Sequence, residues 1–156
     1  KYKLTNIYDL TKHTIDGLAL LSGKKIYGLR FGAVCGWSPL HRNDIMINKM
    51  FVSDPIVVSH PEIFRPVLGM KDLVRAIKTI IDQDGTPGIY NLASFTQTVG
   101  RIAEEVSKLT KVKVVRKDGS MPYDFHMDTT KFEKEFNFKF EESIESIVRS
   151  LSGNGK

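Results

Sequence analysis

The chain alternates between stretches with a helical repeat of apolar residues and short apolar runs typical of buried strands. Residues 71–81 repeat apolar side chains at helical spacing, and the Gly/Pro-rich turn 84–88 ends the repeat. The pattern predicts helices over residues 5–21, 44–51, 71–81, 99–109, 130–136 and 142–151. It predicts strands at residues 26–34, 55–59, 89–92 and 111–116. Strands that alternate with helices indicate an α/β fold with a parallel sheet.

Three residues near the predicted helix ends act as local signals. Gly23 follows the first helix and suits its C-terminal stop, and Asp44 is a candidate N-cap for the second helix. Asp128 precedes the 130–136 helix, so we interpret it as a cap rather than as a catalytic carboxylate.

Composition is that of an ordinary globular protein. The 156 residues are 41% hydrophobic and 26% charged, which is enough apolar material for a core. No apolar run approaches the roughly 20 residues of a membrane helix, and no signal-peptide pattern is visible, so we expect no membrane association. Cys35 is the only cysteine, which excludes an internal disulfide and favours a reducing cytoplasm. It lies in an apolar run and is expected in the core.

The charge pattern argues against nucleic acid as a partner. The net charge is +5, but the 23 Lys and Arg residues are scattered among 18 acidic residues without a basic run or stripe. A basic surface also suits a substrate that carries a diphosphate. No metal site is expected, because no metal-ligand spacing occurs among the four histidines: His13, His41, His60 and His126.

Candidate chemistry appears in the first helix. Tyr8 and Lys12 are four residues apart, so both side chains lie on the same helix face. An ammonium close to a phenol stabilises the phenolate and lowers the phenol pKa, which suits proton transfer with a hydroxyl group near neutral pH. Alone, this spacing is weak evidence, because such pairs are common on solvated helices.

Further motifs follow in a fixed order, at residues 29–37, 42–48, 64–72, 90–92 and 128–131. With the Y-x-x-x-K pair, they resemble the C-terminal half of the extended short-chain dehydrogenase/reductases, the NAD-dependent epimerase/dehydratase family that acts on nucleotide sugars. The resemblance covers essentially the whole chain. The family's glycine-rich pyrophosphate turn has no counterpart here, and neither does the Ser/Thr that precedes its tyrosine. We therefore expect a fragment in which the N-terminal nucleotide-binding half is absent.

The resemblance implies the remainder of a Rossmann domain, a doubly wound parallel sheet, at residues 1–38 and 66–94. It implies a smaller α/β substrate-binding domain at residues 39–65 and 95–156. The cofactor would be NAD, with NADP as the alternative, held by Tyr8, Lys12, Phe31 and Gly32. The catalytic residues would be Tyr8 and Lys12.

The implied substrate is a nucleotide sugar, held by Arg65, Asn48 and Arg42. An arginine fork suits a diphosphate. The sequence leaves open whether the parent enzyme epimerises, dehydrates or reduces. The resemblance also implies a homodimer through the first helix, and we expect the fragment to self-associate through that face or through the exposed sheet. Alone, the fragment is expected to be inactive.

Two other functions stay open: a simple alcohol or ketone reductase of the same superfamily, and a binding or scaffold domain without catalysis. Three positions depart from the family pattern. Ala33 replaces an asparagine, Cys35 a tyrosine and Gly69 a histidine, and the change at Ala33 removes a side-chain hydrogen bond expected to reach the substrate.

Overall fold

The computed structural model describes residues 6–40, 42–119 and 123–153 as an α/β structure, which confirms the expected fold class. Its helices are α1 Ile7–Leu21, α2 Met46–Val52, α3 Met70–Asp82, α4 Val99–Thr110, α5 Thr130–Glu135 and α6 Ile144–Leu151. Its strands are β1 Tyr27–Phe31, β2 Ala33–Cys35, β3 Ile56–Val58, β4 Phe64–Gly69, β5 Gly88–Leu92, β6 Phe95–Thr98 and β7 Val114–Arg116. No described helix is long and apolar enough to cross a membrane.

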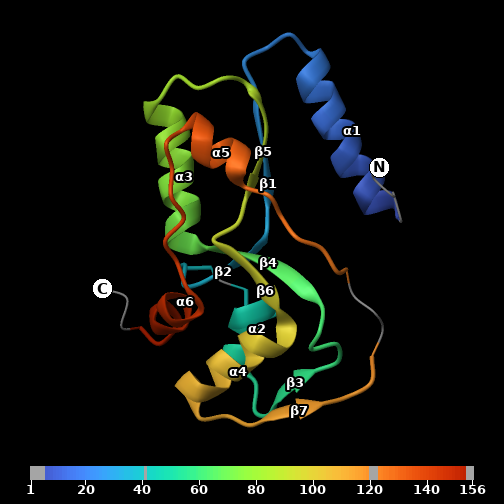
Figure 1. Ribbon diagram of the computed structural model, residues 1–156, viewed down its shortest axis with the longest axis vertical. Coiled ribbons are helices and arrows are strands. Elements are labelled where there is room, and N and C mark those ends of the chain that lie inside the picture. The colour runs from blue at the N-terminus through green and yellow to red at the C-terminus, as the bar shows by residue number, and fades with distance from the viewer. Residues whose placement is uncertain (1–5, 41, 120–122, 154–156) are drawn as a thin grey trace.

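Strands β1 and β5 form the centre of one half of the molecule. They pair in parallel from Tyr27 opposite Gly88 to Phe31 opposite Leu92, as the sequence pattern predicts. Figure 1 shows α1 on one side of this pair and α3 with α5 on the other. Among the described residues β1 pairs only with β5, so its other edge has no strand beside it.

The chain leaves this half at Gly32. The predicted strand 26–34 is interrupted there, and β2 continues into a second sheet in which β4 lies between β2 and β6. A Cβ on Gly32 would stand 2.9 Å from the carbonyl oxygen of Pro66, so only glycine allows this close approach of two backbones. A third, two-stranded sheet pairs β3 with β7 in parallel.

Two hydrophobic clusters stabilise the molecule. The aromatic core lies beside β5 and joins α3 and α5; its buried members are Leu68, Ala76, Tyr90, Leu92, Phe132, Phe136 and Phe138. The aliphatic core lies among α2, α4 and α6; its buried members are Cys35, Ile47, Met50, Ile56, Val58, Val67, Ile102, Ala103, Val106, Ile144, Ile147 and Val148. Adjacent residues of β4 face different cores, because successive strand side chains alternate between the two faces.

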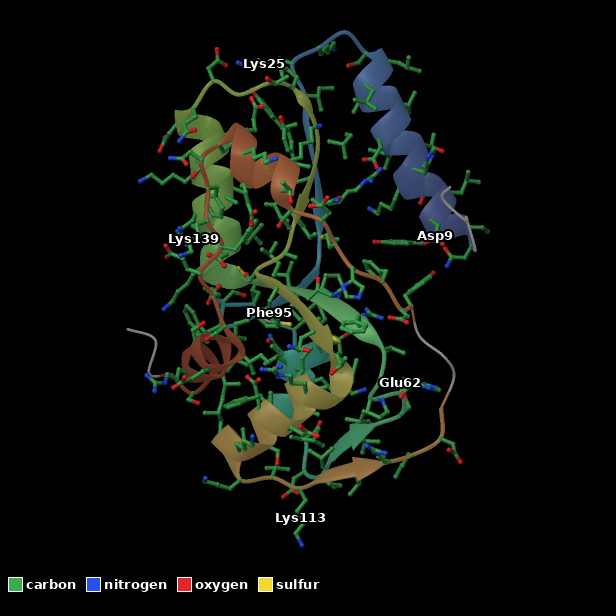
Figure 2. The ribbon with its side chains drawn as sticks, viewed as in Figure 1. Asp9, Lys25, Glu62, Phe95, Lys113 and Lys139 are labelled. Carbon is green, nitrogen blue, oxygen red and sulfur yellow. The ribbon has the colours of Figure 1, made fainter. Side chains whose placement is uncertain are left out.

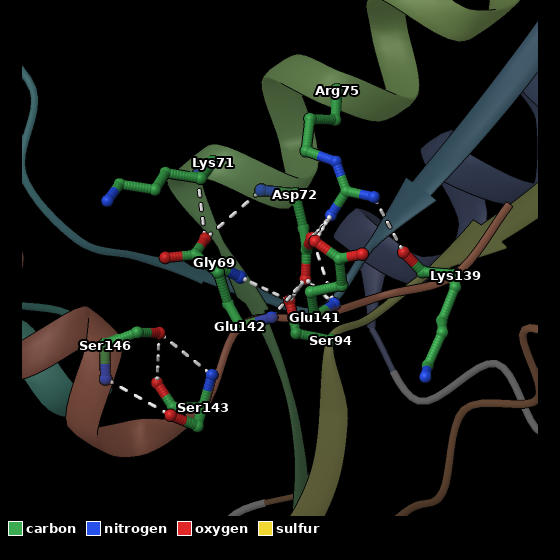
Figure 3. Close-up of polar contacts among 10 residues, drawn as sticks. All are labelled: Gly69, Lys71, Asp72, Arg75, Ser94, Lys139, Glu141, Glu142, Ser143 and Ser146. Atoms are coloured by element: carbon green, nitrogen blue, oxygen red, sulfur yellow. Dashed lines mark hydrogen bonds and ion pairs between the residues drawn. The ribbon is translucent and has the colours of Figure 1, made fainter.

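A buried carboxylate joins the segments that pass between the two cores. Asp72, in the first turn of α3, is 0% exposed. It accepts hydrogen bonds from Ser94 Oγ at 2.7 Å and from the backbone N–H of Glu142 at 2.9 Å, and Arg75 Nη1 lies 2.8 Å away (Figure 3). The chain thus ties the start of α3, the β5–β6 connection and the α5–α6 connection at one side chain. We call this contact the Asp72 junction.

Glu142 adds a second acid to the Asp72 junction. Its carboxylate accepts the backbone N–H groups of Lys71 and Asp72 at the N-terminus of α3, at 2.7 and 3.2 Å. Burial raises the pKa of Glu142 above its ordinary value, although these hydrogen bonds oppose the rise. The carboxylate occupies the place that a side chain at Gly69 would need.

Several local expectations can be compared with the structure. The predicted start of the first helix at Thr5 lies outside the described residues; α1 begins at Ile7, after an Asn6 cap, and Gly23 follows it with φ 66°. The proposed cap at Asp44 is wrong: α2 follows Ile45 without a side-chain cap, because Arg42 holds the Asp44 carboxylate instead. Strands β4 and β6 were not predicted.

Candidate active site

Tyr8 and Lys12 lie on one face of α1. The side chain of Asn6 accepts the backbone N–H of Asp9 at 2.9 Å, and this cap fixes where the helix begins. From that start, the 3.6-residue repeat brings Lys12 Nζ to 5.4 Å from the centre of the Tyr8 ring. Tyr8 is 67% exposed, so its phenol is open to a reactant. The Lys12 ammonium therefore lies close to the Tyr8 ring on the same face of the helix.

The pair faces a cavity of 630 Å³. Its walls are the Tyr8–Asp16 face of α1, Arg30 of β1, Asn91 of β5 and the segment of residues 123–128. In Figure 2 this segment runs past the Asp9 end of α1 before it reaches α5. A cavity of this size can hold a small ligand of several rings.

Hydrogen bonds and ring contacts hold the 123–128 segment in place. Asp124 accepts the backbone N–H of Phe64 at 2.8 Å, and the ring of His126 lies 4.2 Å from that of Phe64. Asn91 of β5 donates to the backbone carbonyl of Asp128 at 3.0 Å. The hydroxyl and N–H of Thr130 hold the pKa of the Asp128 carboxyl below its ordinary value. The N-cap residue of α5 is nevertheless Thr129, without a side-chain cap, so Asp128 lies one residue before the cap position.

Arg65 lies on β4, beside this segment. Its Nη1 donates to the backbone carbonyl of Tyr123 at 3.3 Å, and its guanidinium lies 5.9 Å from the centre of the Phe125 ring. Its Nε is buried and has no hydrogen-bond partner among the described residues. Arg65 therefore contacts two residues of the cavity wall without lining the cavity itself.

The other predicted site residues lie elsewhere. Phe31, 44% exposed, ends β1, and Gly32 donates its N–H to the Leu92 carbonyl at 2.9 Å. Neither lines the 630 Å³ cavity. Both stand where β1 leaves the sheet of β5, at the carboxyl ends of the two parallel strands.

Asn48 and Arg42 lie together at the loop before α2. Asn48 is 2% exposed, and its amide bonds the N–H and carbonyl of Gly36 and the carbonyl of Arg42. Arg42 is exposed and pairs with Asp44, whose carboxyl pKa it holds below the ordinary value. Asn48 thus fixes the shape of this loop, and neither residue lines the 630 Å³ cavity.

Sequence reasoning missed the 123–128 segment. It contributes Tyr123, Asp124, Phe125 and His126 to the cavity wall, although the sequence pattern predicts only a short loop there. A cluster of aromatic and acidic side chains without periodicity was the available signal. His41 lies outside the described residues; of the other histidines, His13 and His126 line the cavity. Among the described residues no three potential metal ligands converge.

Comparison with known proteins adds evidence at the level of fold. No family model and no curated protein matches the sequence. Solved structures do match. The dTDP-glucose 4,6-dehydratase of Bacillus anthracis, in complex with NAD, has a TM-score of 0.80 at 16% identity over 99% of this chain and 54% of its own.

The UDP-glucose 4-epimerase of Bifidobacterium longum, in complex with NAD⁺ and UDP, has a TM-score of 0.73 at 19% identity over 100% of this chain and 58% of its own. The chain has the fold of part of such an enzyme. RMD of Pseudomonas aeruginosa, complexed with NADPH, gives a TM-score of 0.78 at 13% identity, over 99% of this chain and 58% of its own. The family resemblance is confirmed for the fold, and the chain spans about half the length of these structures.

Proposed function

We propose that the gene product containing these residues is an NAD(P)-dependent epimerase or dehydratase of nucleotide sugars, and that this chain supplies its acid–base pair. The observation that carries the proposal is the pair itself. Tyr8 and Lys12 converge on a 630 Å³ cavity within a fold shared with enzymes solved in complex with NAD or NADPH. The guanidinium of Arg65 beside the same cavity suits a diphosphate-bearing substrate, which favours this proposal over a simple reductase.

Tyr8 is the proposed base. Its phenol removes a proton from a sugar hydroxyl, and the Lys12 ammonium stabilises the resulting phenolate because opposite charges favour the ionised form. NAD, when bound, would accept the hydride from the same carbon and return it later. The proton then leaves Tyr8 when the hydroxyl re-forms, so the residue acts in both directions.

The residues present fit the catalytic end of a dinucleotide. Lys12 carries three N–H donors and faces the cavity beside Tyr8, which suits the hydroxyl acceptors of a ribose. Phe31 and Gly32, at the end of β1, would contact the cofactor through backbone groups and the ring face. The glycine-rich turn that holds a pyrophosphate is not among these 156 residues.

Arg65 is the proposed anchor for the substrate diphosphate. Its buried Nε has no partner among the described residues, and a guanidinium fork forms two parallel bonds with phosphate oxygens. Asn48 and Arg42 are proposed as weaker substrate contacts. Asn48 would act through the loop whose shape it fixes, and Arg42 would bind substrate after its ion pair with Asp44 has opened. In this proposal residues 1–38 and 66–94 serve the cofactor, and residues 39–65 and 95–156 serve the substrate.

A Tyr8→Phe variant of the gene product tests the proposal. With a panel of UDP- and dTDP-sugars, turnover should fall by about 10²–10⁴-fold, because a positioned acid or base contributes about that factor. NAD affinity, measured by calorimetry, should stay within twofold. Tyr27→Phe is the matched control, since its hydroxyl donates to the Gly85 carbonyl at 2.6 Å, away from the cavity. Turnover by Tyr8→Phe at the wild-type rate would remove Tyr8 from the mechanism.

Two further proposals accompany this function. The 156 residues by themselves should not turn over NAD, because they contain no preorganised pyrophosphate site. A reducing compartment such as the cytoplasm suits the protein, since its one cysteine, Cys35, is buried as a free thiol. Measurable NAD reduction by the isolated chain would contradict the first of these proposals.

A further inference from the structure

The helix that carries Tyr8 and Lys12 is held mainly by polar contacts. None of the residues of α1 is buried, so hydrophobic packing within the described structure does not fix its position. Near its C-terminal half, Asp16 bonds Arg30 of β1 at 2.6–2.7 Å. This ion pair holds one end of the helix against the sheet.

The N-terminal end of α1 is held by Tyr123. Its hydroxyl accepts a hydrogen bond from Asn6 Nδ2, and it lies 3.5 Å from Asp9 Oδ1. Asn6 caps the helix and also accepts the Asp9 N–H, so Tyr123 contacts the two side chains that organise the first turn. Tyr8 lies between them in the sequence. A displacement of this turn therefore displaces Tyr8.

Tyr123 also contacts the proposed substrate anchor. Its backbone carbonyl accepts the Arg65 Nη1 hydrogen bond at 3.3 Å. One residue thus joins the first turn of α1 to the strand that carries Arg65. No other described residue has hydrogen bonds to both Arg65 and the cap of α1.

We propose that Tyr123 is a positioning residue that fixes Tyr8 above the cavity and links the catalytic helix to Arg65. The proposal rests on the proposed function for its catalytic consequence, but not for the anchoring itself. The reasoning is geometric: a misplacement of about 1 Å in a catalytic group can cost about 100-fold in rate. A tyrosine suits the role because its ring is rigid and loses little conformational entropy when it is held.

Amide hydrogen exchange on the chain tests the anchoring without cofactor or substrate. In Tyr123→Phe, the N–H groups of the first two turns of α1 should exchange about fivefold faster than in the wild type, because the hydroxyl contacts to Asn6 and Asp9 are lost. Exchange in α3 and α4 should not change. Tyr27→Phe, which also loses one phenol hydroxyl, should leave α1 unchanged. Equal exchange in wild type and Tyr123→Phe would overturn the proposal.

Kinetics on the gene product test the catalytic consequence. Tyr123→Phe keeps the carbonyl that Arg65 contacts, so KM for the nucleotide sugar should stay within twofold while kcat falls by about tenfold. An unchanged kcat, or a loss confined to KM, would overturn the positioning role. If Tyr8→Phe has wild-type turnover, the proposed function fails, whereas the exchange measurement still decides whether Tyr123 anchors the helix.

Discussion

Replacement of Asp72 by asparagine perturbs the Asp72 junction with almost no change of volume. In the wild type the buried carboxylate accepts hydrogen bonds from the Ser94 hydroxyl, from the backbone N–H groups of Glu141 and Glu142, and from the Arg75 guanidinium. An asparagine keeps one acceptor oxygen but presents an N–H₂ donor to the remaining donors. A charge-assisted hydrogen bond is worth about 1.5–3 kcal/mol, and an unpaired buried group costs about 1–3 kcal/mol.

Arg75 also lies 2.9 Å from Glu141 and can keep that pairing, so we expect a net loss of about 3 kcal/mol in the free energy of unfolding. For a chain of this size that corresponds to a fall in Tm of roughly 6–12 °C, which circular dichroism can follow. Asp82→Asn, at the exposed end of the same helix, removes the same charge and serves as the control. An Asp72→Asn midpoint within 2 °C of the control would correspond to at most about 1 kcal/mol and would refute the reasoning.

Three further predictions concern other parts of the molecule. Gly69→Ala should lower the free energy of unfolding by about 2 kcal/mol in urea titration, because its Cβ would displace the Glu142 carboxylate; an unchanged midpoint would contradict this. Burial raises the pKa of Cys35 to about 11, so its contribution to stability is complete below about pH 8.5 and is lost as the pH rises through 11. At pH 8 a thiol reagent should label Cys35 at least tenfold faster in denaturant than in the native protein, and equal rates would disprove its burial. The chain should self-associate at micromolar concentration through α1, where the side chain of Leu18 is 64% exposed. In sedimentation experiments, Leu18→Glu should weaken this association, and the control Leu109→Glu on α4 should not. A monomeric wild-type chain would exclude the interface.

The sequence pattern predicts those helices and strands whose conformation is determined by neighbouring residues in the chain. Helices α3 and α4 follow from the repeat of apolar residues, and strands β1 and β5 follow from two short apolar runs. Their parallel pairing is expected from the alternation of strands with helices along the chain. Strand β4 was missed because Pro66 argues against a central strand, yet burial of Val67 and Leu68 on its two faces outweighs that preference. Strand β6 was missed because three of its four residues, Thr96, Gln97 and Thr98, are polar.

The candidate site likewise has one part that the local sequence predicts and another that depends on contacts between residues distant in the chain. The proximity of Tyr8 and Lys12 is a property of one helix and could be predicted from their spacing. The contact between Asn6 and Tyr123 joins residues 117 positions apart, and no local pattern specifies it. The role of Asp72 likewise depends on segments that meet only after folding.

The alternation of the chain between its two cores has a consequence for synthesis on the ribosome. The aromatic core needs Phe132 and Phe136 from α5, and the aliphatic core needs Ile144 and Val148 from α6. Both sets belong to residues 130–151, so neither core can close before these residues have left the exit tunnel. Until then the nascent chain carries two open apolar surfaces. Truncation after residue 129 should therefore leave both cores incomplete rather than remove one of them.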